Sequence, residues 1–435
     1  MDWAAQLVLV LGLLLALLLG GMWLPFAILI SGLLSIVAVD GWFGLNALGF
    51  VLWGGTNSFT LTGIPLFILM SEILLRCGVT VPLYRSLARI VQPLPGGLLQ
   101  TNVLASALFA AICGSSVATA AAIGTVALPN LESHGYDRRA AFGSLAAGGT
   151  LGILIPPSIP LILYGSFTEV SVAKLFMAGV VPGIALALLF MAYIAVRALV
   201  KPVRKPVEGT GDEVRLPLWR TVADLVPFTF LMVVVLGGIY FGFATPTEAA
   251  ALGCAFALVI GAMFGGLNRT VLAQAVEASL RGSCAILFIV VAAMVFAFAF
   301  ENASLGTRLT EWLLSFNLDR NAFLAALLLL YVVLGCLLES IAMIVITVPL
   351  LFPTVLAYGI DPLWFAIALV ILIEFGQLTP PFGINLFVIK RISGAPLGQV
   401  VRGTVPYYGL MIGFLLVITA FPQIVTWLPG MMFER

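Results

Sequence analysis

The sequence predicts an all-α polytopic membrane protein with two inverted repeats, each containing a re-entrant helical hairpin and a broken helix. Three observations support this fold class. Hydrophobic residues make up 62% of the 435 residues and charged residues only 9%, whereas soluble domains carry about 25% charged residues. The mean hydropathy is +1.18. Short Gly/Ser and Gly/Pro stretches interrupt the apolar runs, and these interruptions recur after a fixed interval.

Corresponding interruptions are separated by one constant offset in sequence number, since 380 − 156 = 376 − 152 = 224. Five prolines lie between residues 116 and 182, and four of them have a proline at this offset. With 24 prolines in 435 residues, chance supplies one match in about eighteen trials. Paired breaks in two halves of a membrane chain indicate the binding site of a secondary transporter. The matched pairs include Ser116/Ser340, Pro129/Pro353, Gly152/Gly376, Pro156/Pro380 and Pro157/Pro381.

The first half divides into three regions. Region 1–98 is expected to form scaffold and arm helices, which are 4–21, 22–39, a lateral segment 41–56, helix 58–75 and an amphipathic arm 76–92. Region 99–165 contains the first hairpin, 99–133, and a helix, 139–165, expected to break from Gly148 through Ser158. Apolar runs of about 15 residues on either side of Gly114-Ser115-Ser116 suit a hairpin that reaches only to mid-membrane. Region 166–224 contains connecting helix 176–199 and the polar linker 197–224.

The second half repeats this order. Region 225–321 is expected to hold scaffold and arm helices, namely 225–243, 249–266, the amphipathic arm 268–281 and 283–300. Region 322–389 contains the second hairpin, 322–357, and the second broken helix, 363–389. Region 390–435 ends the chain with one scaffold helix, 404–427.

The distribution of basic residues predicts the orientation. Six basic residues against four acidic ones mark linker 197–224 as cytoplasmic by the positive-inside rule. Counting helices from this linker, the first hairpin opens inward, beside Arg138 and Arg139, and the second opens outward. The second broken helix then ends inside, where Lys390 and Arg391 follow it. The C-terminus is expected on the outer side of the membrane.

The polar residues at the interruptions suit a small cation together with a carboxylate. Hairpin tips and helix breaks free backbone carbonyls, which are hard ligands for Na⁺, and half-helix N-termini favour anions. Hydroxyl and amide side chains add neutral oxygens at the same depth. A carboxylate between the tips would need no arginine, because every arginine of the two repeats falls at a predicted membrane edge. We therefore expect a substrate site formed by Ser116, Ser158, Ser340, Thr379 and Asn385.

Glu339 and Glu374 are acidic residues at membrane depth, and two readings of them stay open. Glu339, at the second hairpin tip, could lie near a cation, or either glutamate could cap a half-helix or pair with a buried hydroxyl. The register pairs Glu339 with Ser115.

Several other classes of function are weaker. Five scattered cysteines and a single histidine, His134, provide neither a disulfide framework nor a transition-metal site. No nucleophile–base constellation is present, so neither catalytic residues nor enzymatic activity are expected. A GxxxxGK[ST] motif for ATP is absent. A net charge of +1 argues against nucleic acid as a partner. Membrane lipid is an expected partner. A channel would need a continuous polar path, whereas these polar stretches are local.

Four motifs, in order along the chain, resemble those of one transporter family. They are Gly114–Thr119 (GSSVAT), Gly152–Ser158 (GILIPPS), Ala244–Ala250 (ATPTEAA) and Thr379–Asn385 (TPPFGIN). The chain resembles, over essentially its whole length, the large membrane (DctM-like, M) subunit of tripartite ATP-independent periplasmic (TRAP) transporters. One departure is the second hairpin tip, Leu338-Glu339-Ser340, where some relatives carry a Glu-Pro-Ser or an Asp/Asn-containing tip.

The resemblance implies an elevator-type Na⁺ symporter of the bacterial inner membrane, with Na⁺ as coupling ion and no further cofactor. Its expected partners are a periplasmic substrate-binding protein and a small four-helix (Q-type) membrane subunit encoded as a separate chain. An organic acid such as a C4-dicarboxylate or sialic acid is the expected substrate. A stand-alone Na⁺/carboxylate symporter or an anion channel is the alternative. In the family Na⁺ lies at hairpin tips and breaks, which here correspond to Ser115, Ser116, Gly152, Ser340, Gly376, Thr379 and Pro380.

The expected motion moves both hairpins and both broken helices as one body against a scaffold of the remaining helices. Runs of small residues such as Ala118-Thr119-Ala120-Ala121-Ala122 suit tight packing within that body. A rocking of two halves about a fixed central site is the alternative, because inverted repeats permit both motions.

Overall fold

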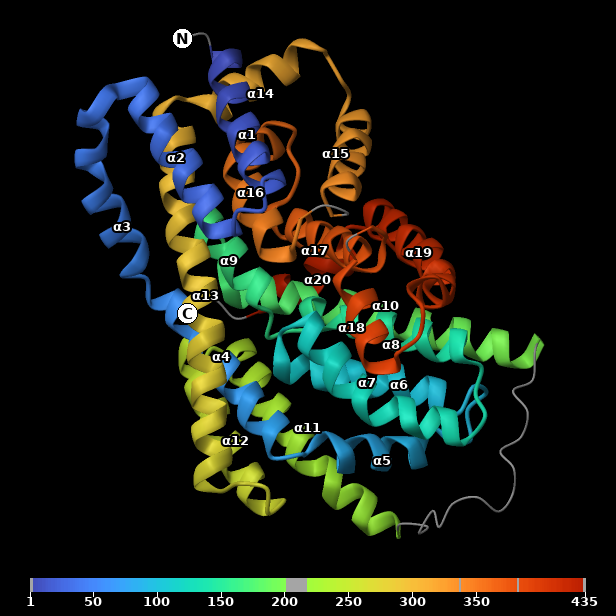
Figure 1. Ribbon diagram of the computed structural model, residues 1–435. Helices are drawn as coiled ribbons and strands as arrows, with labels where there is room; N and C mark the ends of the chain where they lie inside the picture. Colours follow the sequence, from blue (N-terminus) through green and yellow to red (C-terminus); the bar gives the residue numbers. More distant parts are fainter. Residues whose placement is uncertain (1–2, 201–216, 336–337, 382, 433–435) are drawn as a thin grey trace.

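The computed structural model describes residues 3–200, 217–335, 338–381 and 383–432, and every element in these ranges is helical (Figure 1). The first half contains α1 (Trp3–Leu19), α2 (Leu24–Asp40), the 3₁₀ helix η1 (Gly41–Ala47), α3 (Leu48–Thr56), α4 (Phe59–Arg76), α5 (Thr80–Val91), α6 (Leu98–Cys113), α7 (Ser116–Ser133), α8 (Arg138–Leu154), α9 (Ile159–Thr168) and α10 (Val172–Val200). The second half contains α11 (Leu218–Tyr240), α12 (Pro246–Met263), α13 (Arg269–Asn302), α14 (Leu305–Ser315), α15 (Arg320–Gly335), α16 (Ser340–Ala357), α17 (Pro362–Leu378), α18 (Ile384–Ser393), α19 (Leu397–Ala420) and α20 (Gln423–Gly430).

Nine helical segments in the described residues are long and apolar enough to cross a membrane. An apolar helix of about 20 residues matches the hydrocarbon thickness of a bilayer. Four shorter apolar helices, α1, α6, α15 and α17, have 16 or 17 residues, and three of them belong to the hairpins and the second broken helix. The prediction of an all-α, multi-pass membrane protein is confirmed.

Both hairpins and both broken helices are present in matching register. Helix pair α6–α7 forms hairpin 1 and α15–α16 forms hairpin 2, while α8–α9 and α17–α18 are broken helices 1 and 2. Helices α7 and α16 begin at Ser116 and Ser340, whose sequence numbers differ by 224. Helix α17 begins and ends at the same offset from α8, since 362 − 138 = 378 − 154 = 224. Each break contains one cis Pro–Pro bond.

The first break is shorter than the sequence suggested. Helix α8 continues through Gly148-Gly149 to Leu154, and its hydrogen-bond ladder still holds at Ile155, whose N–H donates to Leu151 at 3.0 Å. A Cβ at Gly149 would lie 2.6 Å from that of Ala120 in α7. These glycines therefore allow α7 and α8 to pack closely, and they leave the helix intact.

Three segments of the second half also differ from expectation. The predicted arm 268–281 and helix 283–300 form one 34-residue helix, α13, because a single glycine at the junction does not end a helix. Figure 1 shows α13 running along one side of the molecule. The amphipathic helix α14 was not predicted. The last helix starts earlier than expected, at Leu397, and Pro422 separates α19 from α20.

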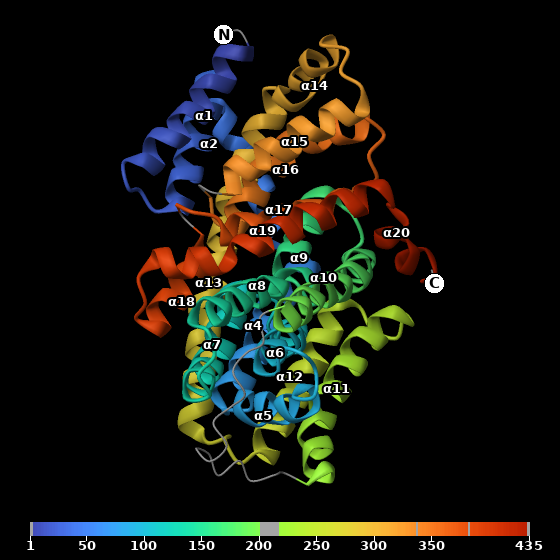
Figure 2. The ribbon, with the colours of Figure 1, turned by 90° about the vertical axis from the view of Figure 1, so that its right-hand side faces the viewer.

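The second half of each broken helix packs on the hairpin of the other repeat. Helix α9 contacts α16, and α18 contacts α7. The rings of Tyr164 in α9 and Phe352 in α16 meet edge to face at 6.1 Å between centroids. On the other side, a Cβ at Gly124 of α7 would meet Ile389 and Ile392 of α18. Hairpin 1 and hairpin 2 lie in opposite halves of the molecule (Figure 2), and the broken helices connect them.

Candidate functional site

The first hairpin tip is seated on the first broken helix. Ser115 is the N-cap of α7, and its hydroxyl accepts from the N–H of Ala118 at 3.4 Å. Gly152 near the end of α8 lies directly beneath it, because a Cβ there would stand 2.6 Å from the carbonyl oxygen of Ser115. The same Cβ would lie 2.8 Å from the Thr119 hydroxyl oxygen. The structure thus brings Ser115 and Gly152 together, as predicted.

The second hairpin tip repeats this arrangement with different atoms. Gly376 of α17 packs against the backbone of Gly335, the last residue of α15, so closely that a Cβ would overlap it. Ser340, the first residue of α16, is buried, and its hydroxyl accepts a hydrogen bond from Nε2 of Gln377. Ser340 and the Gly376 region are therefore adjacent. Sequence reasoning did not assign Gln377 a role, although it lies between the predicted residues Gly376 and Thr379.

One hydrogen bond crosses from the second repeat to the first hairpin. Nδ2 of Asn385, near the start of α18, donates to the Ser116 hydroxyl at 2.7 Å and lies 3.5 Å from the Ala146 carbonyl. Both side chains are buried, with Asn385 fully enclosed. Asn385 is near break 2, where Gly383 approaches the carbonyls of Gln377 and Thr379. The two tips therefore meet opposite ends of the same break.

The other predicted residues, Ser158, Thr379 and Pro380, lie at the breaks. The hydroxyl groups of Ser158 and Thr379 already donate hydrogen bonds to backbone carbonyls. Ser158 is the N-cap residue of α9, and its hydroxyl donates to the Ile153 carbonyl of α8 at 2.5 Å. This hydrogen bond links the two halves of the first broken helix. Thr379 donates to the Phe375 carbonyl at 2.7 Å. Pro380 is exposed beside it.

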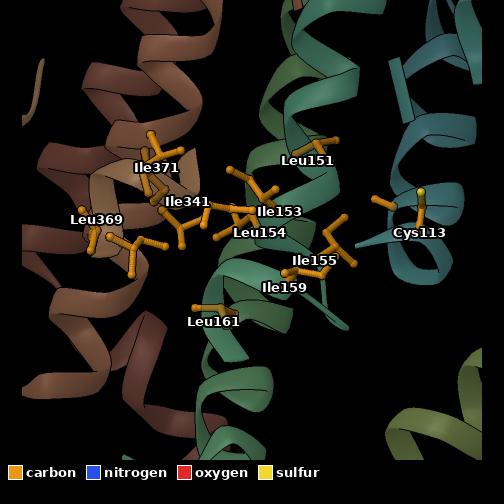
Figure 3. Close-up of a cluster of buried hydrophobic side chains, with 14 of the residues drawn as sticks. Cys113, Leu151, Ile153, Leu154, Ile155, Ile159, Leu161, Ile341, Leu369 and Ile371 are labelled. Carbon is orange, nitrogen blue, oxygen red and sulfur yellow. The ribbon is translucent and has the colours of Figure 1, made fainter. Parts of the chain in front are cut away.

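Apolar side chains fill the region where α16 and α17 pack on the first broken helix. In Figure 3, Ile341 of α16 lies next to Ile153 and Leu154 of the first broken helix, and Ile371 and Leu369 of α17 lie beyond it. All five are buried. Non-helical backbone inside a membrane is tolerated only where protein or a watery cavity covers it, and the break in α8–α9 is fully covered by protein.

The oxygen atoms at the tips suit a small hard cation. Three buried side-chain oxygens there have no hydrogen-bond partner among the described residues, namely Thr119 Oγ1, Gln377 Oε1 and Asn385 Oδ1. Neutral hydroxyl, amide and carbonyl oxygens are ligands for ions such as Na⁺, whereas transition metals prefer imidazole and thiolate. In the described part of the chain, no three His, Cys, Asp or Glu side chains gather to hold a metal ion.

The charged residues near the site occupy contrasting positions. Glu339 is the N-cap residue of α16 and is half-buried. Glu374 in α17 is fully buried, and neither carboxylate oxygen has a hydrogen-bond partner in the described residues, so it does not pair with a buried hydroxyl there. The basic residues of the hairpins and broken helices are all exposed and far along their helices from the tips: Arg138, Arg139, Arg320, Lys390 and Arg391.

Comparison with known proteins gives a consistent result. A sequence model of the tripartite ATP-independent periplasmic transporter DctM component matches residues 11–424. The chain is 34% identical to the C4-dicarboxylate TRAP transporter large permease protein DctM of Pseudomonas aeruginosa, over 92% of this chain and 93% of that protein. It is 29% identical to the sialic acid TRAP transporter large permease protein SiaM of Vibrio cholerae, over 95% and 96% of the two chains. The crystal structure of the Alcanivorax borkumensis YdaH transporter shares the fold, with a TM-score of 0.65 at 17% identity, covering 92% of this chain and 98% of that one.

Proposed function

This chain belongs to the DctM component family of tripartite ATP-independent periplasmic transporters, and on that premise we propose that it imports an organic acid by Na⁺ symport. The observation that carries the proposal is the pair of hairpin tips, each packed on a helix break and each surrounded by neutral buried oxygens. Such oxygens can replace the hydration shell of Na⁺ without adding charge to the membrane interior.

Two cation sites follow from the two tips. The first combines Ser115, Ser116 and the Gly152 region, and the second combines Ser340 with Gly376, Thr379 and Pro380. When bound, Na⁺ would neutralise part of the substrate charge. The protein itself contributes carbonyls from the ends of α8 and α17 and holds the tip serines in place through the contacts described above.

The proposed substrate is a carboxylate such as a C4-dicarboxylate or a sialic acid, because relatives named for both are similar over nearly the whole chain. It would lie between the tips, near Ser116, Ser158, Ser340, Thr379 and Asn385. Ser116 and Ser340 each accept an amide N–H and keep a hydroxyl hydrogen that can be donated to a carboxylate. The starts of α7 and α16 favour the same negative charge.

The transporter would work in the bacterial inner membrane with its C-terminus on the periplasmic side. A periplasmic substrate-binding protein would deliver the acid, and a separate small four-helix membrane subunit would accompany this chain. Both hairpins and both broken helices would move together against the other helices. The cross-packing of α9 on α16 and α18 on α7 supports one body, because the broken helix of each repeat packs against the hairpin of the other.

Uptake of labelled substrate into proteoliposomes tests this function. The complete three-component transporter should accumulate substrate when an inward Na⁺ gradient is imposed and should stop when the binding protein is omitted. K⁺ in place of Na⁺ at equal ionic strength is the control. Equal uptake in K⁺ would contradict Na⁺ coupling, and uptake or current without the binding protein would favour a stand-alone symporter or an anion channel.

A further inference from the structure

The serines at the two hairpin tips are both held by carboxamides from one element, broken helix 2. Gln377, in the last turn of α17, donates to Ser340 of hairpin 2. Asn385, in the first turn of α18, donates to Ser116 of hairpin 1 at 2.7 Å. All four side chains are buried. One short segment of the chain, from Gln377 to Asn385, thus contacts both tips.

This arrangement has no counterpart in broken helix 1. The residues that correspond to Gln377 and Asn385 in the repeat register are Ile153 and Leu161, since 377 − 153 = 385 − 161 = 224. Both are apolar and buried, and Ile153 faces the apolar cluster of Figure 3. The fold repeat alone therefore does not require a carboxamide at either position, and their presence in the second repeat calls for a separate explanation.

Each carboxamide leaves one end without a partner. Gln377 Oε1 and Asn385 Oδ1 are buried and make no hydrogen bond with the described residues. Flipping either amide exchanges its oxygen and nitrogen. The amide oxygen would then accept a hydrogen bond from the serine, and the NH₂ group would have no partner at the tip. An unsatisfied buried polar group costs about 1–3 kcal/mol. A cation beside the amide oxygen would remove that cost in the orientation the structure has.

We propose that Asn385 and Gln377 complete the cation sites at hairpins 1 and 2, and that broken helix 2 thereby makes cation binding at the two tips interdependent. This inference rests on the proposed function. Each amide is a positioning residue for its tip serine and presents its free oxygen to the cation. Binding at one tip orders α17–α18, which helps to form the site at the other tip.

The test measures Na⁺-dependent thermal stability of the purified transporter membrane complex in detergent, with K⁺ replacing Na⁺ to keep ionic strength constant. The variants are Asn385→Leu and Gln377→Ile, which introduce the residue types of the corresponding first-repeat positions. Asn130→Leu is the control, since Asn130 is exposed in hairpin 1 and its amide donates only to Val126 in its own helix.

The wild-type melting temperature should rise sigmoidally with Na⁺ concentration. In N385L and in Q377I the Na⁺ concentration for half-maximal stabilisation should rise about tenfold, the effect of losing one favourable contact. The curve should become hyperbolic in both, although each variant alters a different tip, and N130L should behave as wild type. A purely structural role would lower the melting temperature equally in Na⁺ and K⁺ and would leave the Na⁺ dependence unchanged.

Asn385→Asp keeps an acceptor oxygen at the same position, so it should retain the Na⁺ response even if N385L fails to assemble. If the wild-type protein responds to Na⁺ but N385D, N385L or Q377I does not behave as expected, this inference is overturned and the proposed function stands. A wild-type protein with no Na⁺ response would overturn both.

Discussion

Ser116 and Ser340 occupy the first helical position after each hairpin tip, and their environments are the same in kind. Each is buried and accepts one carboxamide N–H. Register alone predicted that the two serines would be equivalent. Their amide partners were harder to predict, because Gln377 and Asn385 have apolar counterparts in the first repeat, and a repeat argument does not detect residues that only one repeat carries.

Replacing either serine with alanine should raise the Na⁺ concentration needed for half-maximal uptake. The substitution removes a hydroxyl ligand and leaves a buried amide N–H without its acceptor, a change of about 1–3 kcal/mol, which corresponds to roughly tenfold or more in binding. Ser133→Ala is the matched control. Ser133 is exposed in hairpin 1, the hairpin that contains Ser116, and its hydroxyl donates to the Asn130 carbonyl, away from the tip. Unchanged Na⁺ dependence in both S116A and S340A would contradict the assignment of these sites.

At the scale of elements, the decisive contacts are those between each tip and its own broken helix. Gly152→Ala would place a methyl group 2.6 Å from the Ser115 carbonyl oxygen, so the tip must shift. Overpacking of this kind costs about 1–3 kcal/mol. We expect a lower melting temperature and loss of most uptake at normal membrane expression.

Gly409→Ala provides the control for this prediction. Gly409 lies within α19, and a Cβ there would meet nothing within 4 Å. Alanine is also the better helix former, so this variant should keep full uptake and stability. Wild-type uptake in G152A would show that transport does not require close packing of the first hairpin tip on α8.

The sequence predicted the elements better than their boundaries. The hairpins and broken helices were identified because paired glycines, serines and prolines interrupt long apolar runs. The first break was predicted too long, since Gly148-Gly149 serves the packing of α7 on α8 and does not end the helix. Helix α13 was divided wrongly because a change from amphipathic to apolar character does not by itself end a helix. The exchange of half-helices between the repeats depends on three-dimensional packing and could not be read from spacing.

At the scale of the whole molecule, α5 joins hairpin 1 to the surrounding helices. Tyr84 of α5 donates to Asn102 of α6 at 2.8 Å, and Ser86 of α5 donates to Asp224 of α11 at 2.9 Å. Helix α4 packs on α12 and α13, and it also contacts α6. In an elevator motion, hairpin 1 would therefore have to slide along α4.

The native Cys113 at the end of α6 offers a direct measurement of that motion, because its thiol lies beside Ser71 of α4. In a protein without the other four cysteines, Ser71→Cys should crosslink to Cys113, and the crosslink should stop uptake until it is reduced. Under conditions that favour the opposite state, Cys113 should instead react with a cysteine at another depth on α4, such as Ile64→Cys, Phe67→Cys or Leu74→Cys, since one helical turn spans about 5.4 Å. If Cys113 reacts with the same α4 position in both states and the crosslinked protein still transports, the hairpins do not slide and the elevator account is wrong.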